Sequence, residues 1–164
     1  MQSDEARSAQ IAPNRRNRLM ASTEYISVEA YFVCRKYTRA MIIAIAVGGA
    51  IGAVLRYLIA VRVYSFLGID LPYGTLTVNL LGTFLLGIVL GLVEHRGALG
   101  PELRSFLTIG LLGGMTTSST FTYESWEFAR DGEPVRAALN VLLSLVGAFV
   151  LFTAGYGLMR TWGR

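Results

Sequence analysis

The chain has 164 residues, of which 53% are hydrophobic and 16% are charged. This composition is too apolar for an ordinary soluble domain and suffices for four membrane spans of about 20 residues each. The single cysteine, Cys34, excludes an internal disulfide and a cysteine-based metal cluster. Residues 1–40 hold most of the net charge of +4, so the basic balance is no argument for a nucleic-acid partner.

Residues 1–40 are polar and show no sustained periodicity. Arg15, Arg16 and Arg18 form a cluster within them. The composition predicts a disordered basic extension, with the membrane domain occupying residues 41–164. An alternative is that Met41 is the true start and that the preceding segment comes from a misassigned reading frame.

Four apolar segments follow, over residues 41–61, 73–93, 103–128 and 135–159. Each is long enough to cross a bilayer, which predicts an all-α membrane protein with four transmembrane helices. Loop signals separate the segments; those after the first are Arg62, Gly68, Asp70 and Pro72. Pro101 and Glu102 open the third segment with a proline at the first helical position and an acid in the first turn.

The third segment contains a run that suits a continuous helix poorly. Residues 113–121 read GGMTTSSTF, with two adjacent glycines and five hydroxyl side chains. Glycine carries a larger entropy cost in a helix, and clustered Ser and Thr compete for backbone hydrogen bonds. One interpretation is a helix broken at membrane depth, a form associated with ion sites. The other is a kinked helix that packs through its small residues.

Polar residues form stripes on two of the other predicted helices. Thr75, Asn79 and Thr83 are spaced four residues apart and therefore share one face. Asn140 and Ser144 begin a shorter stripe on the last helix, which Ala148 continues without a polar group. An amide in the membrane can join helices or line an ion path, and both readings of Asn79 remain open.

No acid or lysine lies in the middle of any span, and no nucleophile–base pair or phosphate-binding loop is present. We therefore expect no enzymatic activity. The membrane interior instead offers neutral hydrogen-bond donors, which suit an anion that must shed its water. Phe121 adds a ring whose edge carries positive quadrupole charge, although a phenylalanine in a membrane usually serves in packing.

Three stretches in this order resemble the CrcB/Fluc family of fluoride channels. They are GGAIGAVLRY at 48–57, GTLTVNLLGTF at 74–84 and GGMTTSSTFTYE at 113–124. The resemblance covers the chain from about Met41 to Arg160 and leaves residues 1–40 outside. It implies an antiparallel, dual-topology homodimer in the plasma membrane of a bacterium, with two pores that pass fluoride out of the cytoplasm and discriminate against chloride.

The resemblance also implies roles for particular residues. A structural sodium ion would be held by the backbone carbonyls of Gly113 and Thr116. Asn79 would be the pore amide, Phe121 the second of two pore phenylalanines, and Thr75 and Ser144 part of a polar track. The chain departs from the family pattern in having Ser118 where the first pore phenylalanine is expected and Asn140 where a tyrosine is common. Both substitutes can donate hydrogen bonds, so both are retained as pore candidates.

Two other functions compete with the channel. A small multidrug-type exporter is also a four-span dimer, but it would carry a membrane-embedded glutamate in the first span. Residues 41–69 contain no acid at all, which argues strongly against it. A non-transporting membrane scaffold would show no ion flux and would have no use for a broken third span.

Overall fold

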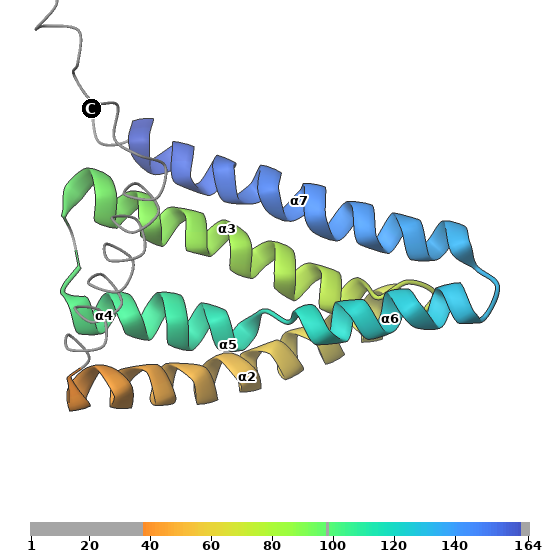
Figure 1. Cartoon of the computed structure of the whole chain (residues 1–164), viewed down its shortest axis with the longest axis horizontal. Helices are drawn as coiled ribbons and strands as arrows, with labels where there is room; N and C mark the ends of the chain where they lie inside the picture. The colour runs from red at the N-terminus through yellow and green to blue at the C-terminus, as the bar shows by residue number, and fades with distance from the viewer. Residues whose placement is uncertain (1–37, 98, 162–164) are drawn as a thin grey trace, which may run out of the picture. The chain divides into compact units, whose positions relative to one another are not determined.

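The computed structural model describes residues 38–97 and 99–161. The predicted disordered extension therefore lies almost entirely outside the described residues. Within the compact unit Arg39–Arg164, the described residues form helices and no strand. In chain order these are α2 (Arg39–Leu67), α3 (Tyr73–Arg96), α4 (Pro101–Ser105), the π-helix η1 (Phe106–Leu112), α5 (Gly113–Met115), α6 (Ser118–Arg130) and α7 (Pro134–Thr161) (Figure 1).

Three of these helices are long and apolar enough to cross a membrane: α2 with 29 residues, α3 with 24 and α7 with 28. The all-helical prediction is confirmed at this level. Assigning Arg62 to the first loop was wrong, because α2 continues to Leu67. A long basic side chain can extend its charge toward water without interrupting the backbone. The helix ends where Gly68 adopts a φ of 80°, which L side chains disfavour.

The segment between α3 and α7 is divided into shorter pieces. Pro101 occupies the first turn of α4 with Glu102 beside it, as the sequence predicted. The chain then passes through η1 and α5 before Thr116 and Thr117 become extended, with ψ angles of 154° and 120°. Thr117 begins α6 by accepting a hydrogen bond from the Thr120 N–H through its hydroxyl. Both Pro101–Met115 and Ser118–Arg130 are shorter than a single membrane span, which needs about 20 residues.

Glycines allow the helices to approach closely. A Cβ on Gly48 or Gly52 of α2 would collide with the backbone of η1. Gly87 of α3 and Gly155 of α7 face each other's helix in the same way. Figure 1 shows the result, in which α3 runs alongside α7 and the segment from α4 to α5 runs alongside α2. Close backbone contact through small residues is the usual mode of helix packing in membranes.

Little of the apolar surface is buried within the chain. Among the described residues, the buried hydrophobic side chains are Val78, Leu112, Met115 and Met159. Large apolar side chains on α2 and α7 are exposed, such as Leu58, Leu142 and Phe149. This distribution requires an apolar environment around the helices, as a bilayer provides.

Candidate functional site

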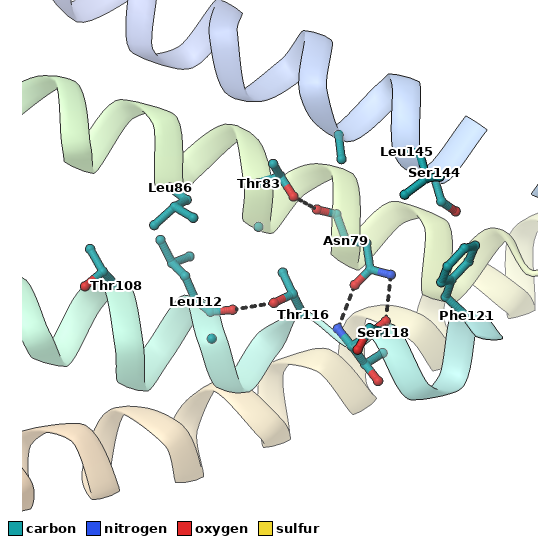
Figure 2. Close-up of a pocket in the computed structure, with 14 residues that line it drawn as sticks. Asn79, Thr83, Leu86, Thr108, Leu112, Thr116, Ser118, Phe121, Ser144 and Leu145 are labelled. Carbon is teal, nitrogen blue, oxygen red and sulfur yellow. Dashed lines mark hydrogen bonds between the residues drawn. The ribbon is translucent and has the colours of Figure 1, made fainter. Parts of the chain in front are cut away.

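A groove of about 440 Å³ lies beside the interruption between α5 and α6 (Figure 2). The residues that line it come from α3, from the segment η1–α6 and from α7. None of them carries a formal charge; they are Asn79, Gly82, Thr83, Leu86, Thr108, Leu112, Gly113, Thr116, Thr117, Ser118, Phe121, Ser144, Leu145 and Ala148. The groove is therefore a neutral surface that mixes apolar side chains with amide and hydroxyl groups.

Asn79 joins α3 to the interruption through two hydrogen bonds with one residue. Its Oδ1 accepts from the Thr117 N–H over 2.7 Å, and its Nδ2 donates to the Thr117 carbonyl over 3.0 Å. Figure 2 shows the side-chain amide turned toward the extended backbone. Because an amide nitrogen has two N–H donors, one remains that no described residue engages. The two readings of Asn79, helix joining and path lining, are compatible with this geometry.

The carbonyls of Gly113 and Thr116 lack their helical partners. In a continuous α-helix they would accept from the N–H groups of Thr117 and Thr120. The first of these donates to Asn79 Oδ1, and the second donates to the Thr117 hydroxyl over 3.3 Å. Within the described part of the chain, no other donor reaches either carbonyl. Two main-chain oxygens at the interruption are therefore available as ligands.

Phe121, Ser118 and Ser144 line the same groove and come from α6 and α7. Ser144 is buried, at 8% exposure, whereas Ser118 is exposed. Asn79, Gly113 and Thr116 line this groove too. Six of the eight predicted site residues therefore lie together in one groove. That grouping describes where the residues lie; their roles remain predictions.

The remaining two predicted site residues, Thr75 and Asn140, do not line this groove. Thr75 is buried on α3, and its hydroxyl donates to Glu124 Oε1 over 2.6 Å. Asn140 is also buried, and its Nδ2 donates to the Ser125 hydroxyl over 2.9 Å. Both side chains connect their helices to α6.

The sequence did not predict the hydrogen bonds that these residues make. Tyr64 of α2 donates to Glu124 Oε1 over 3.3 Å, so one carboxylate oxygen receives hydroxyls from two other helices. The other oxygen, Oε2, is buried and has no hydrogen-bond partner among the residues that the structure describes. Glu124 stands three residues after Phe121, so it lies on a neighbouring part of the same helix face. The three-residue spacing of Phe121 and Glu124 is the feature of the sequence that indicates an acid close to the candidate pore residues.

The family model described as CrcB-like protein, Camphor Resistance (CrcB), matches residues 43–156. Similar proteins carry the name fluoride-specific ion channel FluC. The one from Geobacter metallireducens is 50% identical over 105 residues, which cover 64% of this chain and 85% of the relative. The one from Geobacter sulfurreducens is 48% identical over 114 residues, covering 70% and 92%. The relative from Shewanella sp. strain ANA-3 is 44% identical over 125 residues, covering 75% and 97%. The matched family model and these relatives place the chain in the CrcB-like family.

Proposed function

We propose that this protein is a fluoride-specific ion channel that lets fluoride leave the cytoplasm down its gradient. The observation that carries the proposal is the uncharged groove, which presents hydrogen-bond donors beside an interrupted helix. The names of its relatives point the same way. A passive path for an anion needs donors that replace water without holding the ion too tightly, and neutral donors meet that requirement.

Four side chains would contact the ion in transit. Asn79 contributes the N–H that Thr117 does not occupy, and Ser118 and Ser144 contribute hydroxyls. Phe121 contributes the positive edge of its ring. Thr75 and Asn140 would extend the polar track toward the end of the groove where α6 continues, in keeping with the resemblance. No proton or chemical step is involved, so the protein is not an enzyme.

The proposed channel crosses the plasma membrane four times. α2, α3 and α7 each span it, and the pieces α4 to α6 together form the remaining crossing, the third in chain order, which is broken within the bilayer. An extended backbone at that depth is tolerated only where protein buries it or where it lines a wet cavity, and Thr116 and Thr117 border the groove. The groove is formed by one chain and is open, so an antiparallel second copy would complete two pores related by an axis in the membrane plane.

The carbonyls of Gly113 and Thr116 fit a structural sodium ion. Both oxygens lack helical donors, and no acid lines the groove, so main-chain dipoles are the ligands that the chain offers. Sodium would supply a fixed positive charge between the two copies. The interruption in each copy would contribute the same two carbonyls, which makes the site dependent on assembly.

Fluoride efflux from proteoliposomes tests the function. We expect the purified protein to release fluoride, read with a fluoride electrode, and to leave chloride inside. Asn79→Asp places a negative charge on the anion path and should stop the flux while the dimer still forms. An assembled dimer that passes no fluoride would refute the channel and favour a membrane scaffold. The multidrug-type exporter gains no support, because α2 contains no acid.

A further inference from the structure

The side-chain amide of Asn79 binds Thr117, the residue whose N–H would donate to the Gly113 carbonyl if the helix were continuous. In a continuous helix the Thr117 N–H would donate to the Gly113 carbonyl. Here it donates to Asn79 Oδ1 over 2.7 Å, while the Thr117 carbonyl accepts from Asn79 Nδ2 over 3.0 Å. One side chain on α3 therefore satisfies both main-chain polar groups of Thr117, the residue at which the helix is interrupted.

This pairing offsets the cost of the interruption at Thr117. A buried backbone N–H or carbonyl without a partner is expensive, so a peptide taken out of a helix must find other partners. If the amide were replaced by an apolar side chain, the Thr117 N–H would have to find another acceptor. The Gly113 carbonyl is the acceptor that helix geometry offers, and it accepts from no described residue. If the Thr117 N–H donated to the Gly113 carbonyl, that oxygen would no longer be available as a cation ligand.

We infer that Asn79 is a positioning residue for the cation site, in addition to its place on the anion path. Its Oδ1 holds the Thr117 N–H away from Gly113 and so keeps the Gly113 carbonyl available to a monovalent cation. The inference rests on the sodium site of the proposed function. It follows that one amide serves both ions, and that a substitution at Asn79 changes the cation dependence of the protein as well as its fluoride flux.

The test measures the thermal unfolding of the full-length dimer in detergent as sodium chloride replaces choline chloride. A ligand that binds the folded state raises the unfolding temperature as its concentration increases. We expect Asn79→Leu, which is similar in size and lacks both polar atoms, to raise the sodium concentration at half-maximal stabilisation by about tenfold or more, the size of one competing backbone hydrogen bond. Asn79→Asp keeps the acceptor for the Thr117 N–H and should retain the sodium response, with a midpoint no higher than that of the wild type because its negative charge favours a nearby cation, although it no longer passes fluoride.

Asn140→Leu is the matched control, because it removes a buried amide that contacts Ser125 and not the interruption. Its sodium midpoint should equal that of the wild type. A sodium midpoint in Asn79→Leu equal to that of the wild type would overturn the inference. Loss of the sodium response in Asn79→Asp would also overturn it. The Asn79→Asp result is the deciding measurement if Asn79→Leu does not fold. These results concern Asn79 alone. Absence of both fluoride flux and sodium stabilisation in the wild type would instead refute the proposed function together with the inference.

Discussion

Thr75 of α3 and Glu124 of α6 are joined by a hydrogen bond of 2.6 Å between the threonine hydroxyl and the carboxylate Oε1. Tyr64 of α2 donates to the same oxygen over 3.3 Å. A carboxylate in apolar surroundings needs such donors, because burial without partners is costly. The contact ties three helices together one turn away from Asn79 along α3.

Thr75→Val should therefore destabilise the protein. The substitution keeps the shape of the side chain but removes the shortest hydrogen bond to Glu124, and we expect the free energy of unfolding to fall by about 1–3 kcal/mol. Thermal unfolding in detergent measures the change. Thr153→Val is the control, since that exposed hydroxyl bonds only to carbonyls of its own helix. Equal effects of the two substitutions would show that the contact with Glu124 contributes nothing specific.

Gly52→Ala should impair the packing of α2 against the α4–α6 segment. A Cβ at Gly52 would collide with the Leu111 carbonyl, which is backbone and cannot rotate away. We expect a loss of about 1–3 kcal/mol in folding stability, as is usual for overpacked sites. Gly157→Ala on α7 is the matched control, because its added Cβ meets nothing within 4 Å. It should be neutral or slightly stabilising, since alanine favours helices over glycine; equal stability of both variants would contradict the packing argument.

Phe121→Ile should sharply reduce fluoride flux. Isoleucine preserves bulk and apolar character but has no ring quadrupole, so the ion would lose a favourable contact in the groove. Proteoliposome efflux gives the rate. Phe149→Ile on α7 serves as a control, because that ring is 72% exposed and does not line the groove. Normal conduction by Phe121→Ile would exclude ring-edge contact as the basis of permeation.

Ser118→Phe should be tolerated or should raise the flux. Ser118 lines the groove and is exposed, so a larger side chain can be accommodated without displacing a buried neighbour. A phenyl ring there would restore the residue that the family resemblance leads one to expect. The efflux rate relative to the wild type is the measurement, and complete loss of flux with normal assembly would show that the serine hydroxyl is required.

Periodicity and hydropathy were sufficient to predict the long helices, because α2, α3 and α7 are apolar over more than 20 residues. They did not indicate that Phe106–Leu112 is a π-helix, since the same apolar side chains suit either hydrogen-bond pattern. Hydropathy also placed the end of α2 too early, because the helical backbone continues through polar residues such as Arg62.

The candidate site was predictable in its residue types and only partly in its contacts. Four-residue spacing placed Asn79 and Thr83 on one face, and both line the groove. The same spacing could not reveal that Thr75 binds Glu124, because that contact depends on how α3 and α6 pack. Nor could it show that Asn79 pairs with Thr117, which requires the backbone to leave the helix at that residue.

The basic residues near the ends of the spans predict how the chain is oriented in the membrane. Membrane topology follows the distribution of lysine and arginine in short loops. In the proposed arrangement of four crossings, one side of residues 41–164 would carry Arg96, Arg104, Arg160 and Arg164, and the other would carry Arg56, Arg62, Arg130 and Arg136. This balance gives no preferred orientation, so the segment should insert both ways, as an antiparallel dimer requires.

Residues 1–40 disturb that balance, because Arg35, Lys36 and Arg39 come shortly before residue 41 in the sequence and favour an N-terminus inside. A chain beginning at Met41 should therefore insert in both orientations and conduct fluoride fully, whereas the 164-residue chain should be biased toward one orientation and assemble less well. Reporter domains fused to the C-terminus of each chain distinguish the two sides of the membrane, and efflux assays on the same preparations measure activity. A single fixed orientation of the shorter chain with fluoride flux intact would contradict the antiparallel arrangement, because a parallel population would then suffice for conduction.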